Sequence, residues 1–175
     1  MQIWQAMDET AFSRAKKEYK QFIKLCHKAF INIYFLFIMK VFTDFIKIDS
    51  RGMNEYIDIT PEVNKILENS GIKKGIICLH EMHTTGAIVI QESDSDMHED
   101  TIDIMNDLIP LKRSYRHNYE GNENATAHIK NQLMGSNVSI PIINGKLALG
   151  TWQRIFFIEF FMARQRKIAV SIIGE

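Results

Sequence analysis

Cysteine is scarce in this 175-residue chain, which contains only Cys26 and Cys78. The two residues lie in segments with different patterns, and we expect both thiols to be unpaired in a reducing cytosol. No CxxC pair is present, and this absence excludes a thiolate zinc site of the usual spacing. At this length a core can form without disulfides or a structural metal.

Charge of one sign is not in excess either. Lys and Arg total 21, as do Asp and Glu, so the formal net charge is zero. Proteins that bind the phosphate backbone of nucleic acids usually carry a basic excess, and we therefore expect no nucleic-acid partner. The chain also lacks GxGxxG and P-loop motifs, so nucleotide binding through those devices is not supported.

A long hydrophobic run is missing as well. The longest run, FINIYFLFIM at residues 30–39, is interrupted by Asn32 and bounded by Lys28 and Lys40. It is too short to cross a bilayer as a helix. A long charged stretch precedes it and no small-residue cleavage pattern follows it, so it does not match a signal peptide. We therefore predict a soluble, cytoplasmic protein with no membrane partner.

Residues 1–38 differ in pattern from the rest of the chain and are predicted to form an N-terminal extension. Apolar residues recur there at three- and four-residue spacings, and the opposite face is basic, which predicts an amphipathic helix. Such a helix can bind a membrane surface or a partner. Two alternatives stay open: the helix packs on its own domain, or the stretch is not translated in the native protein and Met39 is the start.

Residues 39–175 are predicted to form one domain of short strands and helices. Residues 41–48 and 56–59 have strand-like patterns on either side of a turn, and we interpret them as a hairpin. The dipeptide Asn144-Gly145 is the strongest local hairpin signal in the chain. Two or three short helices among about seven strands indicate an α+β fold.

Three of the six histidines stand beside other polar residues and are candidates for chemistry. His83 opens the sequence HTT at the end of a predicted buried strand, His117 follows Tyr115-Arg116, and His128 lies near the start of a predicted helix. Neutral imidazole is the commonest protein ligand for zinc and related metals, and it also suits proton transfer near neutral pH. The spacings match no short metal motif, and a lone histidine is more often a hydrogen-bonded structural residue, so both interpretations stay open.

Other polar residues are candidates for the same site. Glu92 follows a predicted strand, where its carboxylate would bind a metal, orient a histidine, or lie at a solvated strand end. Trp152 could stack on a planar ligand while Thr151 and Gln153 hydrogen-bond to it. The alternative is a tryptophan that packs on its own strand.

Two arginines near the C-terminus are candidates for phosphate binding. Arginine can grip a phosphate through two N–H groups, which suits Arg164 and Arg166 to this role. The alternative is a pair of exposed cations at the end of a strand. The acidic run from Asp94 to Asp100 is interpreted mainly as surface and helix-capping residues, although Mg²⁺ favours such oxygen ligands.

The candidate motifs are more specific in combination than singly. In order, HTT, Glu92, YRH, NATAH, LALGTWQ and Glu159 resemble the YjbQ family, the secondary thiamine-phosphate synthase proteins. The resemblance covers about Met39 to Glu175, without the extension, which the family does not normally carry. It implies a β-sandwich-like core of mostly antiparallel strands and assembly as a homotrimer. The pocket residues that it implies are His83, Thr84, Thr85, Glu92, His117, Asn124, His128, Thr151, Trp152, Gln153 and Glu159.

The resemblance also implies thiamine phosphate synthase activity. This reaction joins hydroxymethylpyrimidine diphosphate to a thiazole phosphate and releases pyrophosphate, so the expected partners are small phosphorylated molecules. The three histidines would form the catalytic pocket and the metal ligands, with Glu92 completing or orienting it, and Arg164 or Arg166 would face phosphate. Mg²⁺ would help the diphosphate leave, and Zn²⁺ or a similar ion would suit the histidines. The alternative is a non-catalytic protein on the same fold that binds a divalent metal or a small ligand.

Overall fold

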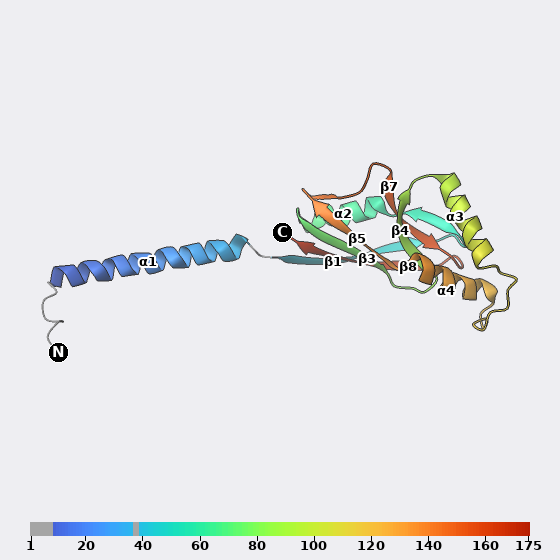
Figure 1. The fold of residues 1–175 in the computed structure, drawn as a ribbon, viewed down its shortest axis with the longest axis horizontal. Coiled ribbons are helices and arrows are strands. Elements are labelled where there is room, and N and C mark those ends of the chain that lie inside the picture. Colours follow the sequence, from blue (N-terminus) through green and yellow to red (C-terminus); the bar gives the residue numbers. More distant parts are fainter. Residues whose placement is uncertain (1–8, 37–38) are drawn as a thin grey trace. The chain divides into compact units, whose positions relative to one another are not determined.

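The structure is a computed structural model that describes residues 9–36 and 39–175 (Figure 1). The chain divides into two compact units, Met1–Ile38 and Met39–Glu175. Residues 37–38, within the apolar run, lie outside the described residues. The first unit contains helix α1 (Glu9–Leu36), and the second contains the strands and the remaining helices.

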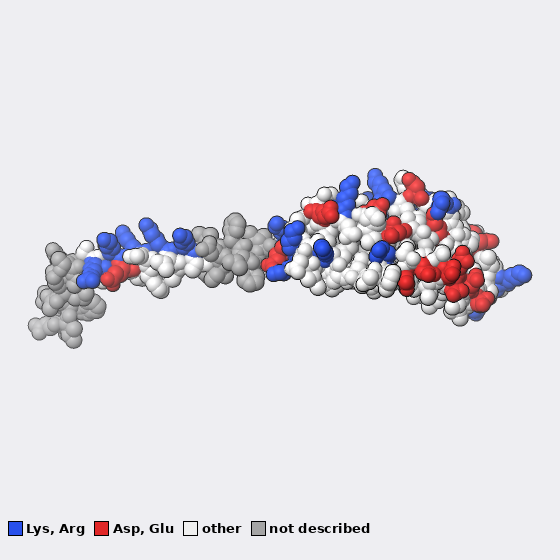
Figure 2. All heavy atoms as spheres, turned by 90° about the horizontal axis from the view of Figure 1, so that it is seen from above, with Lys and Arg blue, Asp and Glu red and all other residues white. Residues whose placement is uncertain are grey.

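Helix α1 separates its basic side chains from its apolar ones. Its side chains are described from Ser13 to Ala29, and each of them is exposed. Six Lys and Arg residues lie in this stretch beside a single acidic residue, Glu18. Figure 2 shows basic side chains along one edge of the helix and mostly uncharged atoms along the other, with acidic atoms toward the left end. Among the described residues, no helix is both long and apolar enough to cross a membrane.

Two antiparallel sheets form the frame of the second unit. The strand order is β1-β8-β3-β5-β6 in the larger sheet and β2-β7-β4 in the smaller one. The larger sheet consists of β1 (Lys40–Asp49), β8 (Gln165–Gly174), β3 (Gly75–Glu81), β5 (Asn137–Ile143) and β6 (Lys146–Leu147). The smaller sheet consists of β2 (Glu55–Asp58), β7 (Gln153–Glu159) and β4 (Gly86–Glu92). Every pairing is antiparallel, which confirms the predicted α+β fold.

Three helices accompany the sheets within residues 39–175. They are α2 (Thr60–Ser70), α3 (Ser95–Leu108) and α4 (Asn122–Met134). Helix α3 is capped by Asp94, whose side chain accepts a hydrogen bond from the Met97 N–H at 2.9 Å. Helix α4 contacts β4, and its buried Ala127 belongs to an apolar cluster with Phe160. The number of helices agrees with the predicted two or three.

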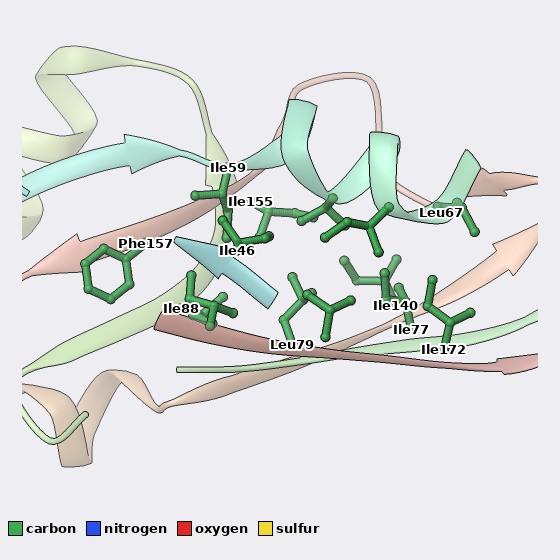
Figure 3. Packing of buried hydrophobic residues seen from close by; sticks show 14 of the residues in the cluster. Ile46, Ile59, Leu67, Ile77, Leu79, Ile88, Ile140, Ile155, Phe157 and Ile172 are labelled. Carbon is green, nitrogen blue, oxygen red and sulfur yellow. The ribbon is translucent and has the colours of Figure 1, made fainter. Parts of the chain in front are cut away.

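Apolar side chains, most of them isoleucine, join the two sheets in one core (Figure 3). Ile77 and Ile172 of the larger sheet share this core with Ile88 and Phe157 of the smaller sheet, and Leu67 adds helix α2 to it. Along β8, buried residues alternate with less buried ones, as expected for a strand with one face toward the core. The second unit is therefore sandwich-like, as predicted.

The predicted hairpin between residues 41–48 and 56–59 is wrong. Strand β1 pairs along its whole length with β8, starting from Lys40↔Gly174, whereas β2 pairs with β7 in the other sheet. The turn between β1 and β2 therefore carries the chain from one sheet to the other. A local turn signal could not reveal this, because the partners of β1 lie more than 100 residues away in the sequence.

The hairpin predicted at Asn144-Gly145 is present. Strands β5 and β6 pair on either side of this dipeptide. Both turn residues have positive φ, 53° at Asn144 and 74° at Gly145. This conformation suits a two-residue turn between twisted strands, and Asn and Gly tolerate it best.

Replacing Gly145 by alanine is expected to lower the free energy of unfolding by about 1–2 kcal/mol, because a side chain disfavours the left-handed region. An added Cβ would also approach Lys73, whose Cδ lies 2.9 Å from its position. Urea unfolding measures the change. Gly150→Ala is the control, since the nearest atoms to that Cβ would be those of Gln153, at 3.4 Å or more. It should shift stability by less than about 0.5 kcal/mol. Equal losses in the two variants would contradict the turn argument.

Candidate functional site

A pocket of about 400 Å³ lies beside α4, between the HTT segment and the loop that precedes α4. Three of the predicted site residues, Thr84, His117 and His128, line it together. The full lining consists of Thr84, Tyr115, Arg116, His117, Ala125, His128, Ile129, Asn131 and Gln132. The pocket combines aromatic and aliphatic side chains with imidazole, guanidinium and amide groups.

The loop between α3 and α4 supplies three of the lining residues and is held by hydrogen bonds. The Asn122 side chain, at the start of α4, donates to the carbonyl oxygens of Leu111 and Arg113 at 2.7 and 3.0 Å. The Tyr115 hydroxyl donates to the Pro110 carbonyl oxygen at 2.9 Å. These bonds position the loop against α4 without regular secondary structure.

The ring of His128 is held in one tautomer. Its Nδ1 lies 2.8 Å from the carbonyl oxygen of Thr84, and a carbonyl oxygen can only accept a hydrogen bond. Nδ1 therefore carries the hydrogen, and in the neutral ring Nε2 keeps its lone pair. That lone pair can accept a hydrogen bond, take up a proton or bind a metal ion.

His117 stands next to His128 at the edge of the pocket. The two ring centroids are 5.1 Å apart and the ring planes meet at 81°. The ring of Tyr119 also lies against His117, at 5.3 Å between centroids and 85° between planes. Edge-to-face contacts of this kind orient an exposed ring. The two imidazoles thus form one polar edge of the pocket.

His83 is engaged by the protein itself. Its ring Nε2 accepts a hydrogen bond from the backbone N–H of Lys167 at 3.0 Å, and its own backbone N–H donates to Oε2 of Glu81 at 3.0 Å. Burial, together with the charges of Arg166 and Arg164, lowers the pKa of His83. A neutral ring is what the acceptor role of Nε2 requires, so only Nδ1 remains to meet a ligand.

The predicted three-histidine metal centre does not form within the part of the chain that the structure describes. No group of three His, Cys, Asp or Glu side chains there is arranged to hold a metal ion. His83 is turned to the Lys167 backbone, whereas His117 and His128 share the pocket edge. A metal ion at this edge would need its remaining ligands from water or from a bound molecule.

A buried ion pair lies beside the HTT segment. Arg166 donates to both carboxylate oxygens of Glu159, from Nε at 2.6 Å and from Nη2 at 2.5 Å, and Nη2 also donates to Oγ1 of Thr85 at 2.9 Å. The Ser50 hydroxyl and the Phe161 N–H also donate hydrogen bonds to the Glu159 carboxylate, at 2.9 and 3.0 Å. Arg166 is therefore not free to face phosphate, and the prediction that it does so is corrected.

Glu81 is a second buried carboxyl near this ion pair, and the sequence-based prediction did not include it. Its Oε1 accepts a hydrogen bond from the Asn131 side chain at 3.0 Å, and Asn131 lines the pocket. Burial raises the pKa of Glu81 to about 7, with the charge of Arg166 opposing the shift and that of Glu159 adding to it. A buried carboxyl that titrates near neutral pH thus contacts a pocket residue.

The sequence does carry a signal for Glu81. Along β3 the buried residues are Ile77, Leu79 and Glu81, every second position. Successive side chains of a strand point to opposite faces, so the apolar pattern predicts that the third member also faces the core. An ionisable residue at such a position marks a buried polar network.

Glu92 and the residues around Trp152 lie at the other end of the smaller sheet. Strand β4 runs from Gly86, next to the HTT segment, to Glu92, which pairs with Gln153. Six strand residues span roughly 20 Å. Trp152 is 71% exposed, and Thr151 is exposed as well. A single chain therefore does not bring this group to the histidine pocket.

The two remaining predicted residues also lie outside the pocket lining. Arg164 is exposed, and its guanidinium carbon lies 5.1 Å from the centroid of the Phe161 ring. Its backbone N–H donates to the Ser50 hydroxyl at 3.0 Å. Asn124 is buried in the first turn of α4, one residue before Ala125 of the pocket.

Comparison with known proteins assigns the domain. A family model described as UPF0047 protein YjbQ-like matches residues 44–175. The chain belongs to this family. The predicted resemblance to YjbQ proteins is thus confirmed, and the whole N-terminal extension, residues 1–38, lies outside the YjbQ-like match.

Individual YjbQ-like relatives align with this chain over nearly their whole length. A UPF0047 protein of Methanothermobacter thermautotrophicus is 39% identical over 137 residues, which is 78% of this chain and 95% of that protein. The UPF0047 protein YugU of Bacillus subtilis is 34% identical over 130 residues, or 74% and 97% of the two chains. A solved YbjQ-like protein of Sulfolobus solfataricus superimposes with a TM-score of 0.74 at 38% identity, covering 78% of this chain and 99% of that one.

The prediction of thiamine phosphate synthase activity is wrong, because membership of the YjbQ-like family does not support it. The Sulfolobus structure is described as that of a protein of unknown function. A solved relative from Clostridium acetobutylicum, with a TM-score of 0.66 and 40% identity over 75% of this chain and 98% of its own, is described as an uncharacterized conserved protein. The M. thermautotrophicus relative bears only the family designation. The comparisons support the family and its fold and give no support to a synthase reaction.

Proposed function

We propose that the pocket beside α4 binds a small organic molecule that carries a phosphate or a similar anionic group. The observation that carries the proposal is the fixed ring of His128, whose Nε2 is left for a ligand because Nδ1 is bonded to the Thr84 carbonyl oxygen. The pocket volume of about 400 Å³ suits a molecule of this size.

The lining residues divide into two groups that fit the two parts of such a ligand. Tyr115, Ala125 and Ile129 offer apolar surface for an organic body. Arg116 supplies a permanent positive charge, and arginine recognises phosphate and carboxylate groups through paired N–H donors. Neutral His128 accepts the P–OH hydrogen of a monoanionic phosphate, and the protonated ring donates to a dianionic one.

Phenyl phosphate, which combines an aromatic body with a phosphate, is the probe for this proposal. We expect isothermal titration to detect its binding, and we expect His128→Gln and Arg116→Gln each to weaken the affinity about tenfold or more, since a hydrogen bond to a charged group contributes about 1.5–3 kcal/mol. His80→Gln and Arg154→Gln, at exposed positions outside the pocket lining, should leave the affinity unchanged. Equal binding of phenol and phenyl phosphate, or equal losses in the control variants, would refute the anion site.

A divalent metal ion is the second candidate ligand of the same edge. Histidines that bind metals usually donate their other ring N–H to a carbonyl or carboxylate oxygen, as His128 does to Thr84, and His117 stands beside it. In the same titrations, binding of Zn²⁺ alone that is lost in both His117→Asn and His128→Gln would favour the metal. The homotrimer and the Mg²⁺ requirement stay predictions.

A further inference from the structure

The apolar side chains of α1 gather on one side of the helix. An α-helix turns by about 100° per residue, and on that basis the apolar residues of the described stretch fall within an arc of roughly 160°. These residues are Ala15, Tyr19, Phe22, Ile23, Leu25, Cys26 and Ala29. Phe22 and Leu25 are each 64% exposed and Tyr19 is 66% exposed, so a broad aromatic and aliphatic surface faces water.

The basic side chains of α1 occupy the rest of the circumference. They are Arg14, Lys16, Lys17, Lys20, Lys24 and Lys28. Their arc begins where the apolar arc ends. The only acidic side chain between Ser13 and Ala29 is Glu18, which falls near one border of the apolar arc and lies 3.5 Å from Arg14 in an exposed ion pair. Figure 2 shows the resulting basic edge of the helix.

We infer that α1 lies along the surface of an anionic lipid bilayer. A helix with aromatic and aliphatic residues on one face and lysines on the other is the form that rests in the interface between headgroups and acyl chains. Each basic residue near an anionic surface adds about 1 kcal/mol of attraction, and Phe22, Ile23 and Leu25 would enter the acyl boundary. The prediction of no membrane partner rested on an apolar run too short to cross a bilayer, and a helix that lies in the interface does not need to cross it.

A second copy of α1 is a poorer occupant of the apolar face. Two-helix pairing uses a narrow seam of apolar residues flanked by oppositely charged side chains. The apolar arc here is wider than such a seam, and between Ser13 and Ala29 a single acidic residue, Glu18, stands against six basic ones. Charge complementarity therefore favours an anionic lipid surface.

Sedimentation of the full chain with vesicles tests this inference. We expect binding to phosphatidylcholine vesicles that contain phosphatidylglycerol, little binding to phosphatidylcholine alone, and weakening at high salt. Lys20→Glu with Lys24→Glu should reduce partitioning at least tenfold, because two attractive charges become repulsive. Phe22→Ser with Leu25→Ser should reduce it at unchanged charge, since apolar area is lost.

The matched control is Lys65→Glu with Lys112→Glu, which makes the same charge change at exposed positions of the second unit. We expect this variant to bind vesicles nearly as well as the native sequence. The inference is overturned if no vesicle binds, if the control variant loses as much binding as the α1 variant, or if the serine variant binds unchanged. Self-association through α1 would also overturn it. In that case copies of the chain associate without lipid, both α1 variants abolish the association, and added vesicles do not compete with it.

Discussion

Replacing Arg166 by methionine is expected to lower the free energy of unfolding by about 3–5 kcal/mol, because removing one partner leaves a buried charge uncompensated. Arg166 and Glu159 are 3% and 0% exposed. The variant would leave the Glu159 carboxylate with hydrogen bonds from Ser50 and Phe161 only. Urea unfolding at constant m-value measures the loss.

Two variants control this expectation. Lys74 forms an exposed ion pair with Glu175 at 3.4 Å, and Lys74→Met should cost less than about 1 kcal/mol because exposed pairs contribute little. The double variant Arg166→Met with Glu159→Leu removes both buried charges and should recover much of the loss. Glu159→Leu alone is measured as well. If the stability losses of the two single variants simply add up in the double variant, the two charges are not coupled and the ion-pair argument fails.

The second large effect concerns pH and Glu81. Its folded-state pKa is raised to about 7, above the unfolded value, so the folded protein holds this proton more tightly than the unfolded chain does. The stabilisation is complete below the unfolded pKa and is lost as pH rises through about 7. A shift of this size corresponds to about 3 kcal/mol. We expect Glu81→Gln to remove this pH dependence.

The measurement is the difference in unfolding free energy between Glu81→Gln and the native sequence, followed from pH 5 to pH 8. His83 contributes in the opposite direction, because its lowered pKa makes its stabilisation fall at acid pH. This contribution is present in both proteins and largely cancels in the difference. The variant should gain in relative stability as pH rises. A difference that is flat across this range would show that Glu81 does not titrate there.

Sequence patterns identified the elements of the fold better than their pairing. Asn144 and Gly145 fix their turn by their own backbone preferences, so the β5–β6 hairpin could be predicted locally. The partner of β1 is β8, at the far end of the chain. Long-range pairing is decided by which apolar faces meet in the core, and a turn signal does not contain that information.

The candidate site was predictable in composition but not in geometry. His117 and His128 line one pocket without His83, and the tautomer of His128 depends on a carbonyl oxygen 44 residues earlier in the chain. Arg166 reads as a free cation in the sequence, and only the fold reveals that Glu159 neutralises it. Glu92 and Trp152 belong to the same series of motifs but lie along the strand away from the histidines.

The series of motifs predicted the family correctly and its reaction incorrectly. HTT joins the buried network around Glu159 through Thr85, and LALGTWQ packs Leu147 and Leu149 against the core. They therefore identify relatives whatever those relatives bind. A shared fold does not specify an activity, and a function has to be argued from the pocket itself.

The position of β8 has a consequence for biosynthesis. This last strand of the chain lies between β1 and β3 in the larger sheet. While the protein is being translated, β1 has no neighbour and β3 has an open edge until Gln165–Gly174 leaves the ribosome. The larger sheet therefore cannot be completed before β8 has been made. A chain released before β8 would expose two unpaired strand edges, which are templates for aggregation.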